Sequence, residues 1–436
     1  MKRGTALRSA VAAATSALAL TLTSCGGSNG PGSASGSSSM QVWVLQDAAL
    51  NPVQHTIANI YNAGKPAVKA SVQAFPNDPY KQKLQTAIGS PNAPDVFINW
   101  GGGNLNTYVK AGNVVDLTAA LDADPKFKNT FLPSVLDGGK LDGKYYGVPM
   151  EGVQPVALFY NKDVFAKAGI SNPPATWKDM LADIDRLKAA GITPIALAGS
   201  QPWTELMWLE YLLDRVGGPQ VFAAIEAGKP GAWQDPAVLT ALTMIRDLVD
   251  RGAFGSNYGS VGADSGGADA LLAKGRAGML LMGSWEYAGQ LSSAPDFVKG
   301  GKLRWAPFPS VEGGKGDVQN VVGNPSNFFS VTTKSPHVRD AIDYIEKTVT
   351  APDYLTGLID VGQVPAVAGL SSRLATGPHA DYATFIYDMV RNAPSFTQSW
   401  DQAVPPATAQ QILTNLQQLF NKQISPQRFV SAVGSS

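Results

Sequence analysis

The stretch Gln41-Val42-Trp43-Val44-Leu45-Gln46 begins the pattern that decides the fold. It is a short, continuous apolar run, which suits a strand buried inside a sheet. Two further apolar runs follow at 68–75 and 95–98, and patterns of helical period separate the three runs at 52–61 and 80–88. Strands that alternate with helices predict right-handed βαβ units and a parallel sheet covered by helices on both faces.

A second α/β series occupies the middle of the chain. The run 156–160 predicts a strand, and 162–167 predicts a helix that stops at Gly169. Thr176 is a good N-cap for the amphipathic helix over 177–190, and Asp179 favours its positive end. Strands are expected at 193–197, 276–281 and 327–332, and helices at 105–110, 203–213, 236–251, 267–274, 285–291, 337–348, 381–390 and 402–420. The 436 residues suggest two or more domains.

The N-terminal residues have the composition of a secretory signal. A basic head (Lys2, Arg3, Arg8) precedes an apolar run over 11–22, which is too short to remain as a membrane-spanning helix. Leu22-Thr23-Ser24-Cys25 resembles the lipobox of bacterial lipoproteins, whose cysteine receives a diacylglycerol. We therefore predict a signal peptide over 1–24, and a lipidated Cys25 that begins a flexible Gly/Ser tether over 25–39. An ordinary secretion signal with a chance cysteine is the alternative.

The composition of the chain narrows the range of possible functions. Removing the three basic residues of the signal from 34 leaves 31 Lys and Arg against 34 Asp and Glu, a formal charge of −3. This balance gives no indication of nucleic-acid binding. His55, His337 and His379 lie far apart, and no Walker A motif occurs. We expect no metal site and no cofactor. Nine Trp and thirteen Tyr are ample for an aromatic-lined ligand site.

Several segments occur together in a characteristic order. They are 94–100 (PDVFINW), 111–118 (AGNVVDLT), 143–149 (GKYYGVP), 158–165 (LFYNKDVF), 173–177 (PPATW) and 273–279 (AKGRAGM), which leads to 283–285 (GSW). This series resembles the extracellular solute-binding proteins of ATP-driven carbohydrate importers, the maltose-binding-protein-like group. The resemblance covers most of residues 40–433, and the lipobox agrees with how Gram-positive members are anchored.

The resemblance implies an α/β, two-lobe, periplasmic-binding-protein-like fold of type II. Lobe one would hold 40–150 plus 308–369, and lobe two 153–305 plus 372–436. Hinge crossings would lie near Glu151-Gly152, near Ala306-Pro307 and near Gly369. Ligands in open α/β sheets sit beyond the carboxyl ends of the strands. A hinge between the lobes lets a bound ligand stabilise a closed state.

The resemblance also implies that the protein binds its ligand and does not catalyse a reaction. A monomer, lipid-anchored on the extracellular face of the cell membrane, would capture a di- or oligosaccharide and deliver it to a membrane permease pair. A separate ATPase would power the transport. Similarity to actinobacterial members favours a sugar of the xylobiose or cellobiose type.

A sugar site needs flat aromatic platforms and polar side chains that fix the hydroxyl groups. The candidate platforms are Trp100, Trp203, Trp285 and Trp400. The candidate polar contacts are Asp47, Asp78, Glu151, Gln154, Glu205, Asn324, Asn327 and Asp401. Structural roles stay open for several of these residues: Asp78 could cap a helix, Trp203 could pack, and Asn324 or Asn327 could satisfy a turn.

Other functions compete with this interpretation. A secreted glycoside hydrolase needs two carboxylates that flank the scissile bond, for which Glu151, Glu205 and Glu286 are candidates without a recognised pair. A peptide or amino-acid receptor of the same fold would favour an arginine for the ligand carboxylate, and none is evident. A purely structural surface lipoprotein does not account for the ordered series of segments.

Overall fold

A computed structural model describes residues 39–263 and 266–434 of the chain. The predicted signal peptide, Cys25 and the tether up to residue 38 lie outside the described residues. No helix in the described part of the chain is long and apolar enough to cross a membrane.

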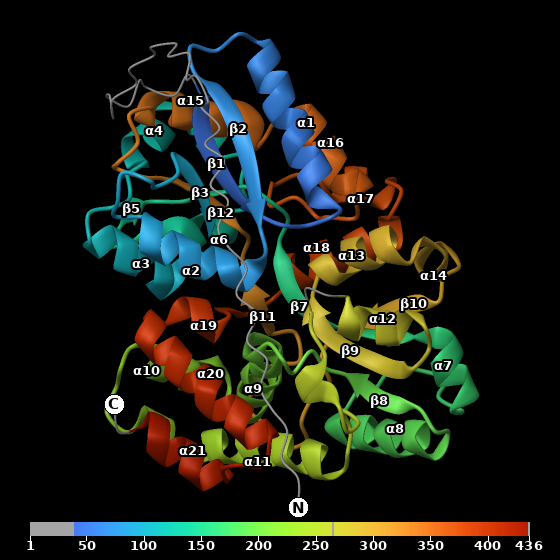
Figure 1. Cartoon of the computed structure of the whole chain (residues 1–436). Helices are drawn as coiled ribbons and strands as arrows, with labels where there is room; N and C mark the ends of the chain where they lie inside the picture. Colours follow the sequence, from blue (N-terminus) through green and yellow to red (C-terminus); the bar gives the residue numbers. More distant parts are fainter. Residues whose placement is uncertain (1–38, 264–265, 435–436) are drawn as a thin grey trace, which may run out of the picture. The chain divides into compact units, whose positions relative to one another are not determined.

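The first main sheet has the order β2-β1-β3-β12-β6. Its strands are β1 (Ser39–Leu45), β2 (Lys69–Phe75), β3 (Val96–Asn99), β12 (Phe328–Val331) and β6 (Val148–Pro149). The helices that accompany it are α1 (Leu50–Ala63), α2 (Asn77–Ala87), α3 (Gly102–Lys110), α4 (Thr118–Ala123), α5 (Pro125–Lys128), α6 (Pro133–Leu136), α15 (Val338–Thr348) and α16 (Pro352–Asp360). A small hairpin pairs β4 (Lys140–Leu141) with β5 (Lys144–Tyr145). These elements occupy the upper part of Figure 1.

The prediction of a parallel sheet is wrong for one of these strands, β12. β1, β2 and β3 are parallel, as the alternating pattern indicates. β12 runs antiparallel to both β3 and β6. Its first residue, Phe328, pairs with Asn99 at the end of β3. The chain thus enters β12 at the edge where β3 finishes, and no local sequence signal records this return from the other sheet.

The second main sheet has the order β13-β11-β7-β9-β8, and β10 also pairs with β7. Its strands are β7 (Gln154–Asn161), β8 (Thr193–Ala196), β9 (Ala277–Gly283), β10 (Leu303–Ala306), β11 (Val321–Asn324) and β13 (Phe396–Gln398). Its helices are α7 (Lys162–Lys167), α8 (Trp177–Ala189), α9 (Pro202–Gly217), α10 (Pro219–Glu226), α11 (Pro236–Asp250), α12 (Gly267–Ala273), α13 (Trp285–Ser293), α14 (Pro295–Lys299), α17 (Ser371–Ala375), α18 (Ala380–Arg391), α19 (Trp400–Ala403), α20 (Pro406–Phe420) and α21 (Pro426–Val433). Figure 1 shows most of them in its lower part.

The second sheet takes in a segment that the sequence assigned to lobe one. β11 pairs antiparallel with β7 and parallel with β13, so the passage to the first sheet lies at 325–327. The predicted crossing near Ala306-Pro307 is therefore too early. Gly323 makes this pairing possible: its φ is +135°, and a Cβ there would lie 2.4 Å from the carbonyl oxygen of Gln154. Glu151-Gly152 lies between β6 of the first sheet and β7 of the second.

Local signals account for the ends of two helices. Thr176 Oγ1 accepts a hydrogen bond from the Asp179 backbone N–H, and the Asp179 carboxylate accepts one from Thr176 N–H, which completes a capping box. The predicted helix over 402–420 is instead divided into α19 and α20. Pro405-Pro406 causes the division, because proline lacks an N–H and disfavours helical backbone in the residue before it.

Candidate ligand-binding site

A cavity of about 250 Å³ lies between the two sheets. Asp47 follows the end of β1, Trp100 follows β3, and Asn324 ends β11. Trp285 follows the end of β9 after one intervening residue. The cavity therefore lies beyond strand ends of both sheets, as expected for a ligand site in α/β proteins. It is lined by Leu45, Gln46, Asp47, Leu50, Asn77, Lys81, Trp100, Glu151, Gln154, Trp203, Met207, Ala263, Ala268, Asp269, Met282, Trp285, Glu286, Gly289, Asn324, Asn327, Ser399, Asp401 and Gln402.

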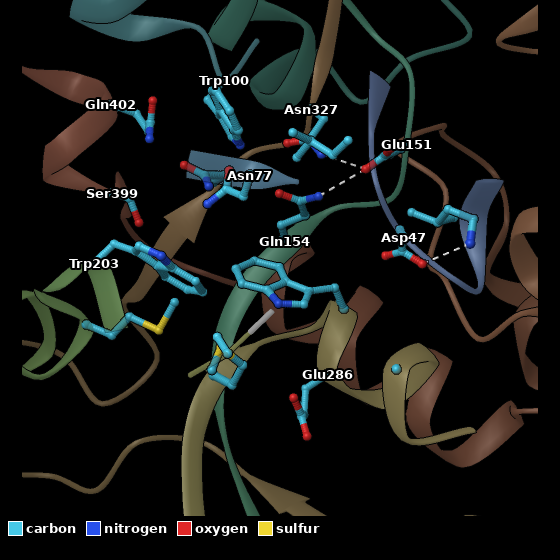
Figure 2. A pocket seen from close by; sticks show the side chains of 18 of the residues that line it. Asp47, Asn77, Trp100, Glu151, Gln154, Trp203, Glu286, Asn327, Ser399 and Gln402 are labelled. Atoms are coloured by element: carbon cyan, nitrogen blue, oxygen red, sulfur yellow. Dashed lines mark hydrogen bonds between the residues drawn. The ribbon is translucent and has the colours of Figure 1, made fainter. Parts of the chain in front are cut away.

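The structure brings nine of the twelve predicted site residues together around this cavity. They are Asp47, Trp100, Glu151, Gln154, Trp203, Trp285, Asn324, Asn327 and Asp401. Figure 2 shows Trp100 and Trp203 facing the same space, with Glu151 and Asp47 to the right and Gln402 and Ser399 to the left. Residues separated by up to about 350 positions in the chain thus meet at one site.

The other three predicted residues do not line the cavity. Asp78 lies in the first turn of α2, where its Oδ1 lies 3.5 Å from the Nδ2 of its cavity-lining neighbour Asn77. Trp400 is 1 % exposed and stacks on Phe222, with ring centroids 4.3 Å apart and planes 4° apart. Its place is in the core, and the adjacent Asp401 faces the cavity instead.

Glu205 is fully buried away from the cavity. It follows Trp203 by two positions in α9, and successive helical residues turn by about 100°, so the two side chains leave opposite faces. The residue that shares the face of Trp203 is Met207, four positions on, and it does line the cavity. Helical spacing could have identified Met207 once Trp203 was chosen.

Two tryptophans provide the main aromatic surfaces. The rings of Trp203 and Trp285 lie 6.3 Å apart at 52°. The Trp285 ring lies directly over Gly283, where an added Cβ would approach the ring to 1.9 Å. A third ring, Trp100, is mostly buried, and Lys81 Nζ lies 5.1 Å from its centroid. The absence of a side chain at Gly283 therefore sets where the Trp285 platform sits.

Glu151 is the centre of a buried polar cluster. Its Oε1 accepts a hydrogen bond from Gln54 Nε2 (3.1 Å), and its Oε2 accepts from Gln154 Nε2 (3.3 Å) and Asn327 Nδ2 (2.6 Å). The bonds to Gln154 and Asn327 are the dashed lines at Glu151 in Figure 2. Burial, together with the charge of Asp47, raises the pKa of Glu151 to about 8. The cluster joins α1, the first crossing and the segment at 325–327.

The lobes also touch beside the cavity. Lys81 Nζ of α2 lies 3.6 Å from the Asp401 carboxylate of α19. Gln398 Nε2 at the end of β13 donates to the carbonyl oxygen of Trp100. At Gly103 a Cβ would lie 2.5 Å from the carbonyl oxygen of Ala403. These contacts join α2 and the start of α3, beside the first sheet, to β13 and α19, beside the second.

The chain matches a known family of proteins over most of its length. The model of the family described as bacterial extracellular solute-binding protein matches residues 33–355. This chain belongs to that family. Family members are solute-binding proteins rather than enzymes, and the family description indicates a location outside the cytoplasm.

Individual relatives agree with the family and the fold. A xylose/arabinose-binding protein of Haloferax volcanii is 28 % identical over 230 residues, which cover 52 % of this chain and 48 % of that protein, so the match spans about half its length. A solved structure concerned with xylan utilization by Caldanaerobius polysaccharolyticus has a TM-score of 0.82 at 28 % identity and covers 91 % of this chain and 99 % of its own. A solved chitin oligosaccharide binding protein has a TM-score of 0.81 at 25 % identity and covers 91 % and 97 %. The prediction of a two-lobe α/β fold is confirmed.

The sequence analysis missed several residues that line the cavity. Asn77, Lys81, Asp269 and Gln402 line the cavity, and Glu286 was considered only as a carboxylate of a hydrolase. Glu286 Oε1 accepts a hydrogen bond from Gln290 Nε2 (2.7 Å), and burial raises the pKa of Glu286 to about 8. Within residues 39–263 and 266–434, no group of three or more His, Cys, Asp or Glu side chains is arranged to hold a metal ion.

Buried glutamates give the solute-binding protein a pH-dependent stability. Burial raises the pKa values of Glu151, Glu205, Glu210 and Glu286 from near 4.5 to about 8. Between these pH values the unfolded chain holds fewer protons than the folded one, so the stabilisation present below pH 4.5 is lost as the pH rises to 8. We expect the free energy of unfolding to fall by up to about 1.4 kcal/mol per pH unit for each glutamate.

Melting temperatures between pH 5 and pH 8 test this expectation. Glu205→Gln should melt with a shallower pH dependence than the unmodified protein, because it removes one of the groups that titrate in this range. The substitution breaks no hydrogen bond of the Glu205 carboxylate among the described residues. The lowered pKa values of Asp116 and Asp250 act below this range and do not interfere. A melting temperature that stays constant or rises from pH 5 to pH 8 would contradict the prediction.

Proposed function

We propose that this protein captures a di- or oligosaccharide outside the cell and delivers it to the membrane permease of an ATP-driven importer. The observation that supports this most is the lining of a single interlobe cavity by Trp203 and Trp285 together with amide and carboxylate groups. Aromatic faces suit the C–H faces of sugar rings, and the polar groups suit their hydroxyls. The names of the similar proteins, which concern xylose, arabinose, xylan and chitin oligosaccharides, support a sugar ligand.

Each cavity-lining residue then has a proposed role. Trp203 and Trp285 stack on sugar rings, and Trp100 closes the opposite side. Asp47, Glu151, Gln154, Asn324, Asn327 and Asp401 bind hydroxyl groups. A neutral plant-derived disaccharide such as xylobiose or cellobiose is the specific ligand that we propose. A separate ATPase would supply the energy, and the protein would act as a monomer.

A thermal-shift screen of the full chain in detergent tests the proposal. The panel contains mono- and oligosaccharides, amino acids and short peptides, because a ligand that binds only the folded state raises its melting temperature. We expect a selective shift with one oligosaccharide class, and that oligosaccharide should be recovered intact. Shifts confined to peptides or amino acids would overturn the carbohydrate assignment. Breakdown of the bound oligosaccharide would overturn the assignment as a receptor without chemistry.

We also propose that Cys25 carries the lipid that holds the protein at the extracellular face of the membrane. Several acyl chains anchor stably where one is marginal. Cys25→Ser should therefore move the protein from the membrane fraction to the medium, as measured by fractionating cells of a Gram-positive host and blotting. Ser24→Ala should leave the protein in the membrane fraction, because alanine is also a small residue before the cleavage site. Retention of Cys25→Ser in membranes would refute the anchor.

A further inference from the structure

Unpaired polar atoms at the cavity indicate the kind of hydrogen bond its ligand must make. Five cavity-lining residues have a buried side-chain atom without a hydrogen-bond partner among the described residues. Four of the atoms are acceptors: Asn77 Oδ1, Asn324 Oδ1, Asn327 Oδ1 and Gln402 Oε1. The fifth, Trp203 Nε1, is a donor. A buried polar atom that stays unpaired is costly, so a ligand that donates to these oxygens gains affinity.

The orientation of three of these amides is fixed by neighbouring carboxylates. Asn327 Nδ2 donates to Glu151 (2.6 Å), and Gln402 Nε2 donates to Asp401 (2.8 Å). Asn77 Nδ2 lies 3.5 Å from Asp78 Oδ1. An ionised carboxylate only accepts hydrogen bonds, and Glu151 is ionised above about pH 8. At such a pH each amide turns its nitrogen towards the carboxylate and leaves its oxygen for another partner. The carboxylates therefore act as positioning groups that make the cavity wall rich in acceptors.

The charge of the cavity lining also favours a ligand that donates hydrogen bonds and carries no negative charge. Five lining residues are acidic, and these are Asp47, Glu151, Asp269, Glu286 and Asp401. One lining residue is basic, Lys81, and it already lies 3.6 Å from Asp401. Above about pH 8, where Glu151 and Glu286 are ionised, a ligand carboxylate would lose its hydration inside the cleft and face both these acidic groups and the amide oxygens. Among the described lining residues it would find no cation that is not already beside a carboxylate.

We propose that the cleft selects its sugar by charge and hydrogen-bond polarity: it accepts neutral, hydroxyl-rich sugars and rejects sugars that carry a carboxylate, the uronic acids. This inference rests on the proposed sugar-binding function and narrows its substrate class. A hydroxyl group donates to an amide oxygen or a carboxylate and carries no charge, whereas the carboxylate of a uronic acid can only accept.

Matched sugar pairs test the inference by titration calorimetry on the full chain in detergent at pH 9, above the raised pKa values of Glu151 and Glu286. Each pair is a neutral disaccharide and the same disaccharide with a carboxylate at C6 of one ring. The pairs are built on cellobiose, on maltose and on the neutral sugar that gives the largest thermal shift. If that sugar is a pentose disaccharide such as xylobiose, which has no C6, one xylose is replaced by glucose in the neutral member and by glucuronic acid in the acidic member. We expect the acidic member to bind at least tenfold more weakly than its neutral partner. Binding of an acidic member within threefold of its partner would overturn the inference and leave the sugar-binding function standing. Absence of binding by every sugar would contradict both.

Charge-neutralising variants identify the residues that discriminate. Titrations are run at pH 9, above the raised pKa of Glu286, which is about 8. Glu286→Gln should reduce the ratio of neutral to acidic affinity by about threefold to tenfold, and Asp269→Asn is the second variant should the first fail to fold. Glu312→Gln, which removes an exposed charge away from the cavity, is the matched control and should leave the ratio unchanged. An unchanged ratio in a folded Glu286→Gln or Asp269→Asn protein would overturn the inference.

Discussion

Replacing Arg215 with leucine is expected to lower the free energy of unfolding by about 3–5 kcal/mol. Arg215 is 1 % exposed, and its Nη1 lies 2.6 Å from the equally buried Asp214 carboxylate. Its Nη2 donates to the carbonyl oxygens of Val318 (3.0 Å) and Asn320 (3.1 Å). The substitution leaves the buried Asp214 carboxylate, the buried Asn320 carbonyl and the partly buried Val318 carbonyl without the Arg215 guanidinium. The loss of this partner costs far more free energy than the intact ion pair contributes.

The same substitution should also weaken ligand binding. Arg215 holds the segment at 318–320 that leads into β11, and β11 ends at the cavity-lining Asn324. Glycines let the segment before residue 318 pass close to the backbone of Asp214 and Arg215. A Cβ at Gly316 would lie 2.0 Å from the carbonyl oxygen of Asp214. The entry of the chain into the second sheet therefore depends on the buried ion pair.

Urea unfolding followed by tryptophan fluorescence measures the effect on stability. Arg391→Leu is the matched control, since Arg391 is half exposed and forms a surface ion pair with Asp388 at 2.8 Å. Surface pairs of this kind contribute about 0–1 kcal/mol. Equal losses of unfolding free energy in the two variants would contradict the prediction, because the buried Arg215 pair would then contribute no more to stability than a surface pair.

Trp285→Ala should weaken sugar binding by about 1–3 kcal/mol, or roughly fivefold to 150-fold, because the ring supplies a flat apolar face to the ligand. Gly283→Ala should produce a loss of similar size while keeping the tryptophan. Its added methyl group would meet the Trp285 ring at 1.9 Å and force the ring off its position. Trp285→Ala measures the effect of removing the ring, and Gly283→Ala measures the effect of displacing it.

Calorimetric titration with the sugar selected in the thermal-shift screen measures both variants. Trp233→Ala is the control, because Trp233 packs edge-on against Trp400 and Phe429 and does not line the cavity. Its affinity should equal that of the unmodified protein. Unchanged affinity in a folded Trp285→Ala protein would remove this ring from the binding site.

The sequence by itself determined the elements of this protein. Apolar runs and helical periods predicted β1, β3 and α7 closely, and the Thr176 cap predicted the start of α8. These features depend on interactions between residues a few positions apart, which any stretch of sequence records. The order of the family segments likewise identified the two-lobe fold before any contact was known.

Only the tertiary structure decided which side chains face the cleft. Trp203 and Glu205 were both predicted to face the cleft, but the turn of α9 directs Trp203 to the cavity and Glu205 to the core. Trp400 was predicted to face the cleft, yet its ring stacks on Phe222 in the core. Gln402, two positions further on, was not predicted and lines the cavity. The Glu151 cluster brings amides together from positions 54, 154 and 327. Such choices depend on contacts between distant segments, and these contacts leave no pattern in the local sequence.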